Sequence, residues 1–174
     1  EAVTAGQNVF LLKGLMEYGS YLGDGGMKGP DYTAEALHLT AQWMNDYYRE
    51  QEKGLDQLDE RERRLRENAI RSRVQMELKE NRYNPDTDEV TMAGVEAFKP
   101  ANYITDPEQI KDLTAFCYWG GWLCATQRPG TSYSYTHNWP YDPEVGNHPT
   151  SATFIWTFIS IFALWIGISV VLYV

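Results

Sequence analysis

Two cysteines and three histidines are the residues of this 174-residue chain best suited to redox or metal chemistry. Cys117 and Cys124 are seven residues apart, so on a helix they share a face but lie two turns, roughly 10 Å, from each other. A disulfide needs Cα atoms within about 7 Å, and the spacing matches neither a Cys-x-x-Cys nor a Cys-x-x-Cys-His motif. We therefore predict two unbridged cysteines that act as small buried apolar residues.

The other candidate groups do not assemble into a catalytic motif. His38, His137 and His148 are far apart in the sequence, and none has a second ligand at the i,i+4 spacing, so a haem or zinc ion bound through histidine is not expected. The glycine-rich residues 23–29 follow no apolar strand and lack a closing Gly-Lys-Ser/Thr, which argues against a phosphate-binding loop. The carboxylates are dispersed, so no acid–base pair is indicated.

Charge divides the chain into two parts. The 15 basic and 24 acidic residues give a net charge of −9, and all of them lie between Glu1 and Glu144. This acidic balance argues against nucleic acid as a partner, because a phosphate backbone attracts clustered Lys and Arg. Residues 151–174, SATFIWTFISIFALWIGISVVLYV, carry no charge and would form a helix about 36 Å long, enough to span a bilayer.

The residues that flank this apolar segment predict its orientation. Residues 131–150 contain Asp142 and Glu144 but no Lys or Arg, whereas cytoplasmic flanks are normally basic. We therefore expect the charged part on the extracytoplasmic side of the cell membrane. A start at Glu1 rather than Met, and an end within the apolar segment, suggest a fragment or a processed chain.

Hydrophobic periodicity and capping residues predict that the charged part is mainly helical. Thr4 and Gln7 have the spacing of a capping box at the start of a first helix. Asp106 and Pro107 indicate the start of another, with Asp as the cap and Pro in the first turn. The predicted helices cover about residues 5–18, 33–53, 55–80 and 106–126, and a turn at 84–86 precedes at most a short strand over 89–92.

The segment 55–80 carries seven acids and seven bases, and its zero net charge argues for a solvated helix rather than a basic binding surface. Acids precede bases at the i,i+4 spacing, which stabilises a helix by about 0.2–0.5 kcal/mol per pair. These pairs are Asp59/Arg63, Glu60/Arg64, Glu62/Arg66 and Glu67/Arg71. The apolar residues expected to face inward are Leu58, Leu65, Ile70, Val74 and Leu78 here, and Ala36, Leu37, Ala41, Trp43, Met44 and Tyr47 in the helix before it.

Three segments also resemble a known family. AGQNVFLLKGLMEYGSYLGDG, GPDYTAEALH and RPGTSYSYTHNWPYDPEVGNHPT, followed by an apolar span, are similar to the extracytoplasmic region and next transmembrane helix of quinol-dependent nitric oxide reductases. The resemblance implies a mainly α fold, namely a cytochrome c-like helical domain without haem followed by one transmembrane helix. The corresponding boundaries are residues 1–130 for the domain, 131–150 for an aromatic linker, which we expect to be extended, and 151–174 for the transmembrane helix.

The resemblance also implies a function. Enzymes of this family reduce NO to N2O with quinol electrons in denitrification, and they belong to the haem–copper oxidase superfamily. Haem b, haem b3, non-haem iron and the catalytic residues would lie in a transmembrane bundle of the same enzyme. This chain would then be non-catalytic and bind no cofactor alone, and its partners would be that bundle, membrane lipid and quinol. The alternative is a single-pass membrane-anchored interaction or structural subunit of another respiratory complex.

Relatives that bind haem c carry a Cys-x-x-Cys-His motif after the first helix. The resemblance aligns that motif with residues 15–19, where Leu15, Tyr18 and Gly19 replace the two cysteines and the histidine. Covalent attachment of haem is impossible without those thiols, and the axial ligand is missing too. The residues expected to fill the space of the haem are Leu15, Met16, Tyr18 and Tyr21.

The glycine-rich loop differs from the family at one position. In the family, a glycine carbonyl and a tyrosine approach a calcium ion that bridges the haem propionates. Gly25 matches the carbonyl position, but Met27 stands at the tyrosine position, and a thioether is a poor ligand for a hard cation. A calcium contact from this domain is therefore disfavoured. Lys28 could instead neutralise the propionates directly, and an ordinary loop lysine is the alternative interpretation.

Overall fold

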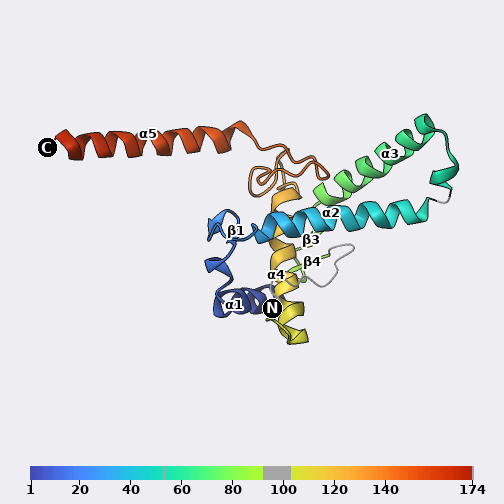
Figure 1. Cartoon of the computed structure of the whole chain (residues 1–174), viewed down its shortest axis with the longest axis horizontal. Coiled ribbons are helices and arrows are strands. Elements are labelled where there is room, and N and C mark those ends of the chain that lie inside the picture. The colour runs from blue at the N-terminus through green and yellow to red at the C-terminus, as the bar shows by residue number, and fades with distance from the viewer. Residues whose placement is uncertain (53, 92–102, 174) are drawn as a thin grey trace.

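The central element of the fold is helix α4, Pro107–Ala125, on which two other helices pack. The computed structural model describes residues 1–52, 54–91 and 103–173. Helix α1, Ala2–Leu12, packs against the first half of α4, and α2, Tyr32–Gln51, crosses its second half (Figure 1). Asp106 caps α4 by accepting a hydrogen bond from the Glu108 N–H. The predicted start and end of α4 are confirmed.

Helix α1 begins earlier and ends earlier than predicted. Glu1 is its N-cap residue and makes no side-chain capping bond, so the capping box predicted at Thr4 and Gln7 is wrong. Packing explains the early start, because Val3 and Gly6 in the first turns already contact the core around α4. After Leu12 the chain turns at Gly14, whose positive φ of 65° ends the helix, and a 3-10 turn follows over Leu15–Glu17.

Two short antiparallel hairpins lie between the helices in the described part of the chain. β1, Ser20–Tyr21, pairs with β2, Asp24–Gly25, with Ser20 opposite Gly25. β3, Tyr83–Asn84, pairs with β4, Glu89–Val90, with Tyr83 opposite Val90. The turn and short strand predicted over 84–92 are therefore confirmed as far as they are described; Met92, the predicted strand end, lies outside the described residues, as does Lys53, the predicted end of α2.

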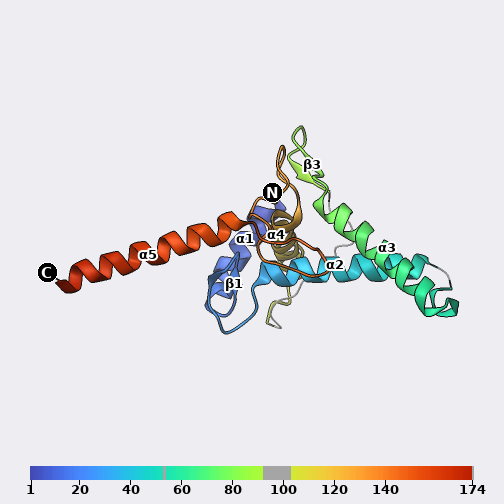
Figure 2. The ribbon, with the colours of Figure 1, turned by 90° about the horizontal axis from the view of Figure 1, so that it is seen from above.

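Helices α2 and α3, Glu60–Lys79, form a helical hairpin that projects away from α4 (Figures 1 and 2). A 3-10 turn over Leu55–Gln57 joins them. Ile70 and Val74 are buried as predicted, but Leu65 is 62% exposed and Tyr47 is 58% exposed. These two predictions are wrong because the distal half of the hairpin extends beyond the core.

Two of the four ion pairs predicted within α3 are replaced by pairs with other elements. Of the four predicted pairs, Glu60 with Arg64 is the one recorded in the described part of the chain. Arg66 pairs with Glu52, and Arg71 with Glu144. Carboxylates brought close by tertiary folding thus replace the local partners, which a helical spacing rule cannot anticipate.

The core consists of two clusters on either side of the α2–α4 crossing. The first joins α1, α2 and α4 around Phe10, Leu15 and Phe116. The second joins α2, α3 and α4 with Val145.

Residues 131–150 are folded onto the helices and do not form the extended linker expected. Ser134, Val145 and Asn147 in this segment are at most 1% exposed. The domain boundary at residue 130 remains a prediction, but the segment beyond it is packed against the domain.

Helix α5, Ser151–Tyr173, leaves the folded part, and no other helix or strand of the described residues lies beside it (Figures 1 and 2). It is long and apolar enough to cross a membrane, and it is not buried inside the structure. The predicted apolar helix is therefore confirmed as far as Tyr173; Val174 lies outside the described residues.

Candidate functional site

The glycine-rich segment that carries Gly25 and Lys28 is held by its own backbone. The Gly26 N–H donates to the carbonyl oxygens of Met16 (2.6 Å) and Gly19 (3.0 Å), and the Lys28 N–H donates to Tyr18 O (3.0 Å). A Cβ on Gly25, where φ is 134°, would lie 2.6 Å from Gly19 O. Glycine is therefore required at position 25, because the loop folds back onto residues 16–19.

Gly25 and Lys28 lie in the same exposed loop, and between them Met27 is 96% exposed. The two predicted site residues, three positions apart in the sequence, are thus both accessible. Their roles toward calcium or haem propionates stay predictions.

Asp31 fixes the base of this loop. Its carboxylate accepts hydrogen bonds from Ser20 Oγ (2.8 Å) and the Gly23 N–H (2.7 Å) in the hairpin. It also caps α2 by accepting from the N–H groups of Thr33 (3.1 Å) and Ala34 (2.9 Å). Partial burial would raise the pKa of Asp31, but the hydrogen bond that the Thr33 hydroxyl donates to it, together with those from Ala34, Gly23 and Ser20, outweighs burial and lowers the pKa below 3.8. One carboxylate therefore joins the loop to α2.

Aromatic rings fill the space beneath the loop. Tyr21 stacks on Phe116 with ring centroids 4.3 Å apart, and Phe10 contacts both Tyr21 and Tyr32 edge-on at 5.6 Å. The Tyr21 hydroxyl donates to Phe116 O (3.0 Å), and burial raises its pKa. Leu15 is 1% exposed within this cluster.

Three of the four residues expected to fill the haem space lie in or against this cluster, but the prediction for Tyr18 is wrong. Leu15 is buried, and Met16 and Tyr21 are packed against the cluster. Tyr18, however, is 65% exposed, because its backbone carbonyl accepts bonds from Lys28 and Gly29 while its side chain stays largely outside the core. The rings of Phe10 and Phe116 occupy the interior instead.

The donor set does not fit a covalently bound haem c. Both cysteines lie on α4, where Cys117 and Cys124 are free and buried, as predicted. Burial raises the pKa of both thiols, that of Cys124 to about 12, so neither is a thiolate at neutral pH. The three histidines lie outside the described aromatic cluster. A haem would need two thiols and a histidine on one segment, and residues 15–19 supply none of them.

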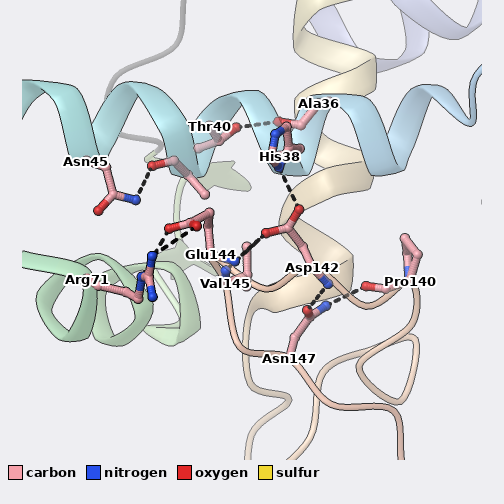
Figure 3. Close-up of polar contacts among 11 residues, drawn as sticks. Ala36, His38, Thr40, Asn45, Arg71, Pro140, Asp142, Glu144, Val145 and Asn147 are labelled. Carbon is pink, nitrogen blue, oxygen red and sulfur yellow. Dashed lines mark hydrogen bonds and ion pairs between the residues drawn. The ribbon is translucent and has the colours of Figure 1, made fainter. Parts of the chain in front are cut away.

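A second polar site lies where the segment around Asp142 meets α2 and α3 (Figure 3). His38 Nδ1 lies 2.8 Å from Asp142 Oδ2. Arg71 of α3 makes two contacts with Glu144, at 3.2 and 3.3 Å. The cleft here is lined by His38, Gln42, Asn45, Asp46, Arg49, Glu67, Asn68, Arg71 and Glu144.

The contacts along this cleft join α2, α3 and the segment before α5, and its described residues do not form a metal-binding group. Its charged groups are largely paired with one another, as in the contacts of Arg49 with Glu67 and of Arg71 with Glu144. Within residues 1–52, 54–91 and 103–173, no group of three His, Cys, Asp or Glu could hold a metal ion. The arrangement therefore joins the segment before α5 to the helical hairpin.

Asn147 completes this junction from below (Figure 3). Its Oδ1 accepts from the Asp142 N–H (2.8 Å), and its Nδ2 donates to the carbonyl oxygens of Pro140 (2.7 Å) and Cys124 (3.3 Å). Asp142 Oδ1 in turn accepts from the N–H groups of Glu144 and Val145. A buried polar side chain thus ties the segment to the end of α4.

This junction is not predicted by the sequence. His38 and Asp142 are 104 residues apart, and no local pattern links them. The sequence offers one signal, which is the Asp142-Pro143 pair. An Asp side chain often accepts hydrogen bonds from the N–H groups two or three residues later and so closes a turn.

Comparison with known proteins identifies the family. A family model for the cytochrome c-like domain of NorB, a nitric oxide reductase component, matches residues 1–100 and 93–141. The match covers α1 to α4 and the first eleven residues of the segment 131–150. No curated protein matches the chain.

Proposed function

The chain belongs to the NorB cytochrome c-like domain family of nitric oxide reductases, and from this premise we propose that it is the non-catalytic extracytoplasmic part of a quinol-dependent nitric oxide reductase. In such an enzyme, two NO molecules, two electrons and two protons give N2O and water in the membrane part. The folded part of the chain would cover the membrane part of the enzyme on its extracytoplasmic side, and α5 would anchor it in the membrane.

We choose quinol as the electron donor because side chains fill the space around residues 15–21, where a haem c would otherwise lie. A domain that relays electrons from a soluble donor needs a redox centre. Here Leu15, Tyr21 and Phe116 belong to one packed hydrophobic cluster, and the thiols that could attach haem c are absent from residues 15–19. Electrons would therefore reach the membrane part from quinol in the bilayer without passing through this domain.

The direction of α5 supports a position of the glycine-rich loop against the membrane part. In both views, the region of β1 lies at the end of the folded part toward which α5 runs (Figures 1 and 2). If α5 crosses the bilayer, this loop faces it. Gly25 and Lys28 would then approach the haem-bearing bundle, with the Lys28 ammonium near propionates in place of a calcium ion.

The proposed function is tested on the complete membrane enzyme. The reduced-minus-oxidised spectrum should show haem b without haem c, and NO should be consumed with quinol but not with reduced cytochrome c as donor. A haem c band, or activity with cytochrome c alone, would contradict the proposal. A preparation with neither haem nor NO consumption would favour the alternative, a single-pass subunit of another complex.

Lys28 is tested separately by comparing Lys28→Gln with Lys111→Gln, a change at an exposed lysine on α4. If Lys28 neutralises propionates, its loss should lower the reduction potential of the neighbouring haem, because a positive charge favours the reduced form. The control should leave the potential unchanged. An unchanged potential in Lys28→Gln, or a structure with calcium at the propionates and Lys28 in bulk solvent, would contradict the proposed neutralisation of propionates by Lys28.

A further inference from the structure

A polar cavity lies where the ends of α3 and α4 meet the segment before α5. It has about 430 Å³ of empty space, part of it open to solvent, which is room for several water molecules at about 30 Å³ each. Apart from Ala125 and Gly146, the residues that line it have polar side chains, and none of them is acidic. They are Lys79, Gln127, Ser132, Asn138, Asn147 and His148.

Lys79, the last residue of α3, brings a positive charge to this cavity. Its Nζ donates to the Gly146 carbonyl oxygen at 3.2 Å, and an ammonium group can donate further hydrogen bonds. None of the ion pairs in the described part of the chain includes Lys79. This half-buried ammonium therefore lies at the cavity without a counter-charge from the described residues.

The acids of the neighbouring segments are bonded to other groups. Glu80, the residue after Lys79, pairs with Arg82 at 2.8 Å. The carboxylate of Asp142 pairs with His38. The cleft at the contact of His38 with Asp142 contains charges of both signs (Figure 3), whereas the side chains of this cavity bring a cation and no acid.

Three further side chains of the lining can donate hydrogen bonds. The amides of Asn138 and Asn147 are already bonded to backbone carbonyl groups. The side chains of Gln127, Ser132 and His148, however, have no recorded hydrogen bond within the described residues. An amide, a hydroxyl and an imidazole can each donate to an oxygen atom, so neutral donors surround the charge of Lys79.

We propose that this cavity binds a phosphate-type oxyanion, attracted by Lys79 and hydrogen-bonded by Gln127, Ser132 and His148. Lysine binds phosphate as a compact point charge, and hydrogen bonds between ionised groups are the stronger ones. A tetrahedral oxyanion offers several acceptor oxygens at once, which suits donors from separate side chains. A metal cation is disfavoured, because the lining has no carboxylate to bind it.

Two sources can supply this chemistry, and the inference does not rest on the proposed function. His148 lies three residues before Ser151, the first residue of α5. If α5 crosses the bilayer, the phosphate group of a lipid can reach the cavity. Free phosphate from the solvent is the other source.

Protection of Lys79 from acetylation tests the site in the complete membrane protein that contains this chain. The protein is purified in a maltoside detergent without phosphate, treated with an acetylating ester and mapped by peptide mass spectrometry. Inorganic phosphate should slow the acetylation of Lys79 several-fold and in a saturable way, whereas potassium chloride at the same ionic strength should not. Lys111, an exposed lysine in the first half of α4, should react at one rate throughout.

Nanodiscs without free phosphate distinguish the two sources. Protection of Lys79 in phosphatidylglycerol discs, but not in discs of a galactolipid that lacks phosphate, would show that the ligand is a lipid headgroup. Protection by inorganic phosphate in detergent would show that free phosphate binds. Equal acetylation of Lys79 under all of these conditions would overturn the inference.

Two double variants test the neutral donors. Gln127→Ala with Ser132→Ala should raise several-fold the phosphate concentration, or the phosphatidylglycerol fraction of the discs, that gives half protection. The matched control is Gln57→Ala with Ser72→Ala, which should leave that value unchanged. All four side chains are exposed, so both variants should fold. Equal values in the two variants would contradict the assignment of these donors.

Discussion

Asn147 is predicted to hold the segment before α5 on the end of α4, and the structure gives the size of its contribution. Asn147→Ala removes three hydrogen bonds, made at 2.8, 2.7 and 3.3 Å. The N–H of Asp142 and the carbonyl oxygens of Pro140 and Cys124 then lose their partner in a region where Asn147 is 1% exposed. A net loss of about 1 kcal/mol for each bond gives a local destabilisation of about 3 kcal/mol.

The thiol of Cys124 reports this local opening. It is fully buried, and burial raises its pKa to about 12, so an alkylating reagent reaches it only when the junction opens. A loss of about 3 kcal/mol should therefore speed its labelling about 100-fold, provided that opening and closing are fast relative to labelling. Peptide mapping separates it from Cys117, which lies in the other core cluster and serves as the internal reference.

The matched control is Asn68→Ala, which truncates an exposed asparagine of α3 in the same cleft. Labelling of Cys124 in this variant should stay close to the wild-type rate. The reasoning is refuted if Asn147→Ala labels Cys124 no faster than Asn68→Ala does. Equal acceleration at Cys117 and Cys124 would also refute it, because that pattern means global unfolding rather than release of the junction.

Two further predictions concern acid stability and helix crossings. Because the folded state lowers the pKa of Asp31, the stabilisation from its carboxylate is present above the ordinary pKa of 3.8 and is lost as the pH falls through the lower folded value. Chemical denaturation should therefore show that the loss of unfolding free energy in Asp31→Asn shrinks from pH 6 to pH 3. A loss that stays constant over this range would contradict the prediction. Gly6→Ala should lower the free energy of unfolding by about 1–3 kcal/mol, and Gly120→Ala by a similar amount, because its Cβ would meet the buried Thr33 and the Tyr21 ring that is stacked on Phe116. A higher melting temperature in either alanine variant would show that helix propensity outweighs the crossing.

The sequence determines those parts of the fold that depend on local signals. Helix α4 is predicted closely because Asp106 and Pro107 act within one turn, and the capping geometry is observed. The apolar segment of α5 is predictable because composition alone distinguishes it. Likewise, the absence of cysteines from residues 15–19 is plain in the sequence, and the buried Leu15 agrees with a filled interior.

The remaining features depend on contacts between distant residues. Thr4 has a capping spacing, but packing of Gly6 on α4 extends the helix past it. Residues 131–150 show no periodic pattern of apolar residues. Hydrogen bonds from side chains to backbone groups hold this segment in its folded conformation. Asn138 shows this: its Oδ1 accepts from the Ser134 N–H, and its Nδ2 donates to His148 O. Such bonds follow no sequence spacing, so the sequence predicts an extended linker where the structure has a folded segment.

The segment before α5 also determines how that helix is oriented relative to the glycine-rich loop. Thr150, directly before α5, donates its N–H to His137 O (3.1 Å), and its hydroxyl lies 3.1 Å from His137 Nδ1. Asn147, three residues earlier, is bonded to the end of α4. Because bonded residues lead directly into α5, the direction of α5 is fixed relative to α4 and hence to the loop at Gly25 and Lys28. If α5 crosses the bilayer, its direction therefore also sets where this loop meets the membrane part.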